Sequence, residues 1–117
     1  GVGAFGEAMK YLSGLKLDDT IFQFVDSGKP FVGICLGLQL LFDSSEEFGD
    51  YSGLGLIKGK VKKFKIYSHN STKYPVPQIG WNKIKRMDAS WEDSLLCNNT
   101  NDDFMYFVHS YFVLGTR

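Results

Sequence analysis

One short stretch limits the possible folds of this chain more than any other, because it changes from strand to helix at a single cysteine, Cys35. Residues 31–34 are wholly apolar, as expected for a parallel strand covered on both faces, and residues 36–42 continue the run with good helix formers. Apolar residues at helical spacing predict two earlier helices, one over residues 7–12 and one between Asp18 and Ser27. This order predicts an α/β fold: three layers, with a mostly parallel open sheet, helices on both faces, and chemistry at the carboxyl ends of the strands.

The rest of the chain alternates polar loops with further predicted strands. Lysines between 58 and 65 alternate with apolar residues, which is more typical of an edge strand protected by charge than of a site for phosphate or an acidic partner. The last apolar run should be a core strand, which His109, Ser110 and Tyr111 interrupt. The predicted strands are 53–57, 60–67, 82–86 and 104–113, the predicted loops and turns are 43–52, 68–73 and 98–103, and 74–77 is extended.

Composition argues against several classes of function. Lysine plus arginine total 13 and aspartate plus glutamate total 13, so there is no global charge to attract nucleic acid or an anionic membrane. The longest apolar stretch, residues 30–42, falls short of the roughly 20 residues that a bilayer span needs. Two cysteines make no disulfide framework, and no basic leader precedes an apolar core. We expect a cytoplasmic protein.

No cofactor or metal is expected from the sequence. The two histidines and two cysteines lack the spacing of metal ligands. The glycines at 53 and 55 lack the third glycine of the dinucleotide fingerprint and the helix that should follow it.

Cys35 lies between Gly33 and Gly37, at the predicted turn from strand to helix. This pattern is that of a nucleophile elbow with cysteine in place of serine. The glycines should be required sterically for the tight turn, while the amides at the start of the next helix stabilise a thiolate and a developing oxyanion. From these five residues alone, a catalytic thiol and an inert core cysteine remain open alternatives. Cys97 is predicted to be a small buried apolar residue.

Five blocks of residues follow one another in a distinctive order. They are 1–6 (GVGAFG), 29–42 (KPFVGICLGLQLLF), 53–57 (GLGLI), 80–82 (GWN) and 106–111 (YFVHSY). Together they resemble the class I glutamine amidotransferases, and within that family they are most similar to the glutaminase subunits of imidazole glycerol phosphate synthase, of histidine biosynthesis. The resemblance covers most of the chain and implies a flavodoxin-like arrangement of the α/β domain.

The resemblance assigns roles to individual residues. It implies that the thiolate of Cys35 attacks the side-chain amide of L-glutamine and forms a glutamyl thioester, with release of ammonia. Backbone groups around Gly1, Val2 and Gly3, with the amide of Leu36, would form the oxyanion site. The side chain of Gln39 and the strand residues Ser110 and Tyr111 would bind the substrate.

The same resemblance implies a protein partner. Gly80, Trp81 and Asn82 match the segment that faces the cyclase subunit, with which the glutaminase subunit forms a heterodimer. Gln78 stands just before it, where members of the histidine pathway usually have histidine. This departure leaves open a paralogous amidotransferase that supplies ammonia for the amidination of cell-surface sugars.

The resemblance also shows what this sequence lacks. The general base and its orienting acid come from a Phe-His-Pro-Glu type motif that is not found here, and neither His69 nor His109 matches the base. Both ends look cut, so residues 1–117 are predicted to be part of an amidotransferase domain, poorly stable and inactive alone. A noncatalytic interaction module stays open, as does a relative of PfpI-type proteases, against which Gln39 and residues 109–111 argue.

Overall fold

The computed structural model describes residues 1–65, 68–69, 72–73, 75–87 and 90–115. The chain divides into two compact units, one of Gly1–Lys65 with Ser110–Arg117 and one of Ile66–His109. We call them unit 1 and unit 2, and each is described by itself. Unit 1 holds the segments that the sequence places around Cys35.

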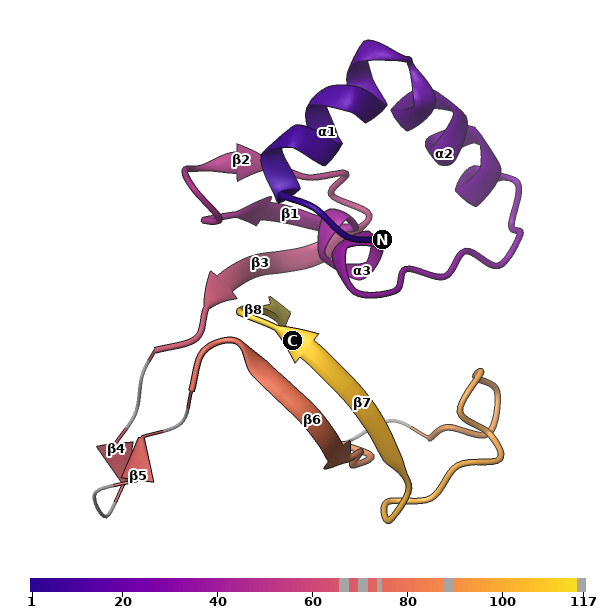
Figure 1. Cartoon of the computed structure of the whole chain (residues 1–117). Helices are drawn as coiled ribbons and strands as arrows, with labels where there is room; N and C mark the ends of the chain where they lie inside the picture. Colours follow the sequence, from indigo (N-terminus) through magenta and orange to yellow (C-terminus); the bar gives the residue numbers. More distant parts are fainter. Residues whose placement is uncertain (66–67, 70–71, 74, 88–89, 116–117) are drawn as a thin grey trace. The chain divides into compact units, whose positions relative to one another are not determined.

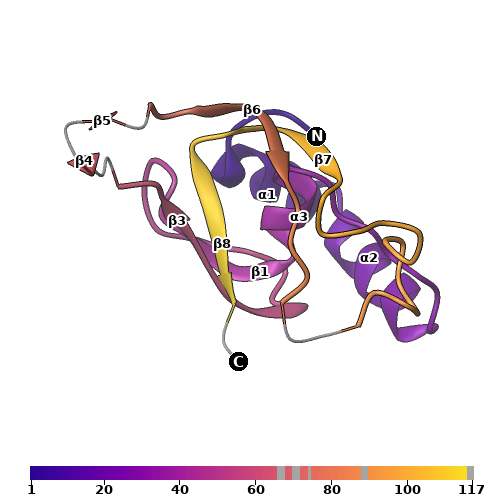
Figure 2. The ribbon, with the colours of Figure 1, turned by 90° about the horizontal axis from the view of Figure 1, so that it is seen from below.

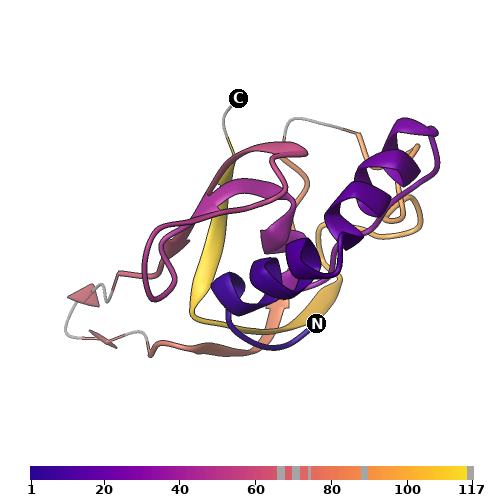
Figure 3. The same ribbon diagram turned by 90° about the horizontal axis from the view of Figure 1, so that it is seen from above.

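Three helices belong to unit 1 (Figure 1). They are α1 (Phe5–Gly14), α2 (Leu17–Asp26) and α3 (Leu36–Leu40). The first two predicted helices are confirmed: α1 is longer than expected, and α2 begins one residue earlier than predicted. Lys16, in a left-handed conformation with φ 55°, lies between them. Figure 3 shows α1 and α2 following one another along the chain. The third helix is shorter than predicted, because the chain turns at Leu41 into a strand.

Unit 1 also contains a four-stranded sheet of order β2-β1-β3-β8. Its strands are β1 (Phe42–Ser45), β2 (Tyr51–Ser52), β3 (Ile57–Lys63) and β8 (Tyr111–Gly115). Strand β1 is parallel to β3, whereas β2 and β8 are antiparallel to their neighbours. Figure 2 shows β1, β3 and β8 side by side. The α/β class is confirmed, and the sheet of the described residues is mixed rather than mostly parallel.

Two strands of this sheet lie where a loop, 43–52, was expected, so that prediction was wrong. The polar residues of β1 are accommodated by cross-strand bonds: the carboxylate of Asp43 accepts from the amide of Gly59 at 2.9 Å and from Lys58 Nζ at 3.1 Å. Ser45, at the end of β1, is 2 % exposed, and its hydroxyl accepts from the amide of Glu47 at 3.1 Å. Polarity alone therefore does not identify a loop when the neighbouring strand supplies partners.

The lysine-rich strand β3 is not an edge strand, because it lies between β1 and β8. Its lysines alternate with buried Gly59 and Val61. Lys58 and Lys62 form ion pairs with Asp43 at 3.1 Å and with Glu46 at 2.8 Å. The lysines of β3 therefore do not protect an exposed edge. Two of them pair instead with an acid of β1 and with an acid of the turn that follows β1.

Residues 31–34 form no strand in this structure, contrary to the prediction. Val32 is 54 % exposed and Ile34 is 73 % exposed. A central parallel strand needs a ladder of hydrogen bonds on both sides. Among the described residues no strand pairs with this segment, and the nitrogen of Gly1 donates to the carbonyl of Ile34 at 3.2 Å.

The core of unit 1 forms where α1, α3 and the sheet meet. Its most deeply buried side chains are Phe5 and Val61. Eight residues make up this buried cluster: Phe5, Leu36, Leu40, Leu41, Phe42, Leu54, Val61 and Tyr111. Leu36 and Leu40 belong to α3, so the helix that follows Cys35 is held by apolar packing against residues from earlier and later parts of the chain.

Unit 2 contains two small antiparallel sheets. One is the pair β4 (Ser68–His69) and β5 (Thr72–Lys73), within the predicted loop 68–73; the other is the pair β6 (Gln78–Lys83) and β7 (Phe104–His109). Strand β6 begins earlier than the predicted 82–86, and the predicted strand 104–113 is split at Ser110 into β7 and β8. The turn predicted at 98–103 is confirmed in part, and residues 66–67 and 74 of predicted extended segments lie outside the described residues.

Candidate active site

Cys35 is the residue immediately before α3, and its backbone is in an uncommon conformation. Its φ is 54° and its ψ is −117°, on the side of φ space that residues other than glycine seldom occupy. The amide of Gly37 donates to the carbonyl of Ile34 at 2.9 Å, and the amide of Gln39 donates to the carbonyl of Cys35 at 3.1 Å. The thiol is exposed. The predicted sharp turn into a helix at this cysteine is confirmed, and strained backbone of this kind is often found at functional sites.

The two glycines that flank the turn differ in what surrounds them. A Cβ added to Gly33 would lie 2.7 Å from the carbonyl oxygen of Gly37 and from the backbone of Leu38. A Cβ added to Gly37 would meet nothing within 4 Å. The steric requirement predicted for both glycines is thus confirmed for Gly33 and is wrong for Gly37.

The glycine-rich beginning of the chain lies beside this turn. The nitrogen of Gly1 donates to the carbonyl of Ile34, and a Cβ on Gly3 would be 3.9 Å from a methyl group of Leu36. Gly3 has a φ of 119°, which favours glycine. Val2 is 96 % exposed, so its side chain adds no packing. The structure brings Gly1, Val2 and Gly3 to the residues on either side of Cys35.

Two of the predicted substrate residues also meet in unit 1. The side-chain Nε2 of Gln39 donates to the main-chain carbonyl of Tyr111 at 3.4 Å, across 72 positions of sequence. The carbonyl of the neighbouring Ser110 accepts from the amide of Phe64 at 3.0 Å. Helix α3 and the start of β8 are therefore in contact, while the roles of Gln39, Ser110 and Tyr111 in binding stay predictions.

The ring of Tyr111 is buried in the core of unit 1. Burial raises the pKa of its phenol, and the nearby negative charges of Glu47 and Glu46 raise it further. Each of these effects disfavours the phenolate. The phenol of Tyr111 is therefore kept in its neutral form.

Glu47 is a residue that the sequence interpretation did not include. One of its carboxylate oxygens accepts from the amide of Phe5 at 2.7 Å, and this bond joins positions 42 residues apart. In the sequence Glu47 lies in a predicted loop, and no spacing rule links it to Phe5. The adjacent acids at 46 and 47 are the only sequence signal at this position.

The predicted partner residues lie on strand β6 of unit 2. Gln78 is paired with His109, Gly80 with Phe107, and Trp81 with Tyr106. The ring of Trp81 is 68 % exposed and its centroid is 5.5 Å from that of Tyr106. The side-chain amide of Asn82 donates to the carbonyl of Gly80 at 3.4 Å. Trp81 lies with Tyr106 and Phe104 on the exposed face of this strand pair, whereas Gln78, Gly80 and Asn82 alternate onto the opposite, half-buried face.

The remaining cysteine and histidines have other surroundings. Cys97 is exposed, so the prediction of a buried residue was wrong: it lies in a polar turn, where its amide donates to the carbonyl of Ser94 at 3.1 Å. The ring of His109 lies 5.8 Å from that of Phe107, centroid to centroid. His69 belongs to β4, and its side chain is outside the described part of the structure.

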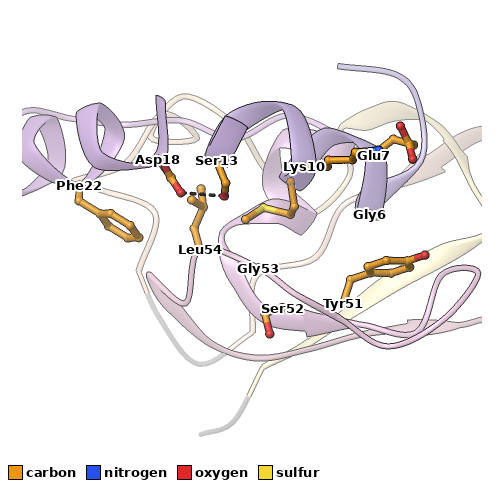
Figure 4. A pocket seen from close by; sticks show the side chains of 11 residues that line it. Gly6, Glu7, Lys10, Ser13, Asp18, Phe22, Tyr51, Ser52, Gly53 and Leu54 are labelled. Atoms are coloured by element: carbon orange, nitrogen blue, oxygen red, sulfur yellow. Dashed lines mark hydrogen bonds between the residues drawn. The ribbon is translucent and has the colours of Figure 1, made fainter. Parts of the chain in front are cut away.

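A concave region of unit 1 lies away from Cys35, between α1, α2 and residues 51–54 (Figure 4). Its volume is about 500 Å³. Within its lining, the Ser13 hydroxyl donates to the carboxylate of Asp18 at 2.8 Å. It contains none of the predicted site residues; its lining is Gly6, Glu7, Met9, Lys10, Ser13, Asp18, Phe22, Tyr51, Ser52, Gly53 and Leu54.

The described part of the chain lacks two kinds of feature. In that part of the chain, histidine, cysteine, aspartate and glutamate side chains form no group of three or more that could hold a metal ion. Within the same residues, no helix has the length and apolar character needed to cross a membrane.

Nearly the whole chain matches one known protein family. The profile of the family described as glutamine amidotransferase class-I matches residues 3–115. This chain belongs to the class I glutamine amidotransferase family. The match spans the beginning of the chain, the turn at Cys35 and the strand that holds Tyr111.

Among individual proteins the chain is similar to three that carry one name, imidazole glycerol phosphate synthase subunit HisH. The protein of Bacillus subtilis (strain 168) is 45% identical over 115 residues, which are 98% of this chain and 52% of that protein. The protein of Helicobacter hepaticus is 47% identical over 113 residues, 97% of this chain and 50% of that protein. The protein of Sulfurimonas denitrificans is 47% identical over 114 residues, 97% of this chain and 53% of that protein. The chain spans about half the length of the curated relatives that it matches.

Proposed function

We propose that the protein carrying this chain is the glutaminase subunit of an imidazole glycerol phosphate synthase and works in histidine biosynthesis. The observation that carries the proposal is the turn at Cys35, an exposed thiol with the glycine-rich segment Gly1–Gly3 beside it. The membership in the amidotransferase family and the names of the relatives support it. We expect it in the cytoplasm.

The proposed reaction begins with attack of the Cys35 sulfur on the side-chain carbonyl carbon of L-glutamine. The carbonyl oxygen becomes an oxyanion, which amides of the Gly1–Gly3 segment and of Leu36 stabilise. The carbon–nitrogen bond then breaks, and the nitrogen takes up a proton and leaves as ammonia. A thioester joins the glutamyl group to Cys35 until water attacks the same carbon, releasing glutamate and the thiol.

We assign substrate selection to residues of α3 and of the start of β8, which are in contact. Gln39 is one helical turn after Cys35, and its side chain already reaches the main chain of Tyr111. We assign Gln39, Ser110 and Tyr111 to the amino-acid end of glutamine. The base that takes and returns the protons is expected from the part of the relatives' length that this chain does not span, since neither His69 nor His109 matches it.

The proposed recipient of ammonia is the cyclase subunit, bound as a heterodimer through Gln78, Gly80, Trp81 and Asn82 of β6. An exposed tryptophan suits the centre of a protein interface, because such residues supply much of the binding energy there. The exposed ring of Trp81 supports this assignment.

The test is ammonia release from glutamine by the longest protein that carries this chain, in complex with the cyclase subunit. Cys35→Ala should abolish release, and Cys97→Ala, the matched control at the other exposed cysteine, should leave it within about twofold. A glutamine analogue with an electrophilic side chain should label Cys35 and spare Cys97. Turnover that survives Cys35→Ala would overturn the proposal, and vigorous turnover by residues 1–117 alone would overturn the assignment of the base to another segment.

A second candidate rests on Gln78, which departs from the usual histidine of the histidine pathway. It is the paralogous amidotransferase that feeds the amidination of cell-surface sugars. Glutaminase activity without any binding to the cyclase subunit would favour this candidate. Complex formation with the cyclase, measured by calorimetry, would exclude it.

A further inference from the structure

The carboxylate of Glu47 takes the place of a cap at the beginning of α1. The first amides of a helix have no partner within the helix, and a side chain of the preceding residue usually accepts from one of them. Here that residue is Ala4, which makes no such bond. The amide of Phe5 instead donates to Glu47 at 2.7 Å, in a partly buried position. The beginning of α1 is thus held from a distant part of the chain.

Glu47 is itself held in place by the turn that follows β1. Its amide donates to the hydroxyl of Ser45, which is fully buried. The preceding Glu46 is fixed as well: its carboxylate accepts from Lys62 at 2.8 Å and from the amide of Lys63 at 2.7 Å. The carboxylate of Glu47 therefore projects from a braced turn that is tied to the central strand β3.

Phe5 is anchored twice as a result. Its ring is completely buried in the core, and its amide is bonded to Glu47. At the other end of the segment, the ammonium group of Gly1 donates to the carbonyl of Ile34 at 3.2 Å, in an exposed position. Between these two anchors lie Val2, Gly3 and Ala4, of which Val2 and Gly3 are exposed and Ala4 is half-buried. The conformation of this stretch depends on its ends, because glycine-rich backbone has many accessible conformations of its own.

We propose that Glu47 is a positioning residue, which keeps the Gly1–Gly3 backbone in place beside Cys35 so that its amides meet the oxyanion. This inference rests on the glutaminase function proposed above. The benefit is geometric: an oxyanion donor acts only when it is already in place, and a misplacement of about 1 Å can cost on the order of 100-fold in rate.

The experiment compares Glu47→Ala with Glu47→Gln in the longest protein that carries this chain, bound to the cyclase subunit. Glutamine keeps an oxygen that can accept from the amide of Phe5, so it should retain most of the activity. Alanine removes the acceptor, so kcat at saturating glutamine should fall by at least about 10-fold. The matched control is Glu7→Ala, which removes an acid from the same first turn of α1 and should leave kcat within about twofold.

Hydrogen exchange gives a readout that does not depend on activity. The amide of Phe5 should exchange at least about 10-fold faster in Glu47→Ala than in the parent protein, and no faster in Glu7→Ala. Unchanged exchange would overturn the tether even if the protein proves to have no glutaminase activity. Faster exchange with unchanged kcat would refute the positioning role alone. A rise in KM at constant kcat, with glutamine no better than alanine, would show that Glu47 acts on the substrate's charge and would also refute it.

Discussion

Replacement of Gly33 by alanine should damage this protein far more than the same replacement at Gly37. At Gly33 the new Cβ would stand 2.7 Å from three backbone atoms of Gly37 and Leu38, whereas ordinary van der Waals contact begins at about 3.4 Å. Backbone atoms of the turn cannot rotate away as a flexible side chain could. Relief requires a shift of α3, so we expect the general cost of overpacking, about 1–3 kcal/mol.

At Gly37 the same substitution should change the unfolding free energy in the opposite direction. A Cβ there would meet nothing within 4 Å, and the residue lies inside α3. Alanine in place of a helical glycine stabilises by roughly 0.5–1 kcal/mol. The two variants add the same methyl group four positions apart, and their unfolding free energies should differ by about 1.5–4 kcal/mol.

Urea unfolding followed by circular dichroism measures this difference directly. The m value should be the same for both variants, so that the midpoints can be compared. If Gly33→Ala unfolds at the same urea concentration as Gly37→Ala, or at a higher one, the steric argument for the turn at Cys35 is wrong.

Three further predictions concern side chains away from the turn. Burial, reinforced by the charges of Glu47 and Glu46, raises the pKa of Tyr111 above its ordinary 10.0. The contribution of this phenol to the unfolding free energy should therefore be complete below about pH 10 and decline as the pH rises through the raised pKa. Tyr111→Phe should flatten the alkaline limb of a plot of unfolding free energy against pH. The hydrogen bond from Lys62 lowers the pKa of Glu46 below its ordinary 4.5. The contribution of the Glu46 carboxylate to the unfolding free energy is therefore present above pH 4.5 and is lost as the pH falls through the lowered pKa. Glu46→Gln should flatten the acid limb of the same plot, and an unchanged limb would contradict the pairing. Trp81→Ala should change the unfolding free energy by less than about 1 kcal/mol, since the ring is exposed, yet weaken binding to the cyclase by about 2 kcal/mol or more; unchanged binding in calorimetry would remove Trp81 from the interface.

The features predicted correctly from the sequence are those set by neighbouring residues. The turn at Cys35 depends on Gly33, two positions before it, and the helices α1 and α2 depend on spacings of three and four residues. Such patterns are local, so the sequence displays them directly. The family blocks then indicated which residues belong near the cysteine, and the contact of Gln39 with Tyr111 agrees with them.

The features that sequence reasoning missed depend on distant partners. Residues 31–34 have the composition of a buried strand, but a strand exists only where another strand pairs with it, and none of the described residues does so. Strand β1 looks like a loop because most of its residues are polar. Its acid, Asp43, is satisfied by Lys58 and Gly59 of β3, which the local sequence does not reveal. Glu47 was missed for the same reason, since its partner Phe5 is 42 residues away. No local pattern contains these pairings.

The antiparallel ladder between β3 and β8 has a consequence for how this protein can vary. Lys63 is paired with Tyr111, so the chain leaves unit 1 and returns to it at neighbouring points of one sheet. Unit 2 is thus an insertion between two adjacent strands, and the entropy of closing such an insertion grows only slowly, by about 0.6 kcal/mol for each doubling of its length. As far as loop closure is concerned, the segment proposed to recognise the cyclase can therefore be lengthened or shortened with little cost to the ladder between β3 and β8. We therefore expect the length of the segment proposed for partner binding to vary without a change in the turn at Cys35.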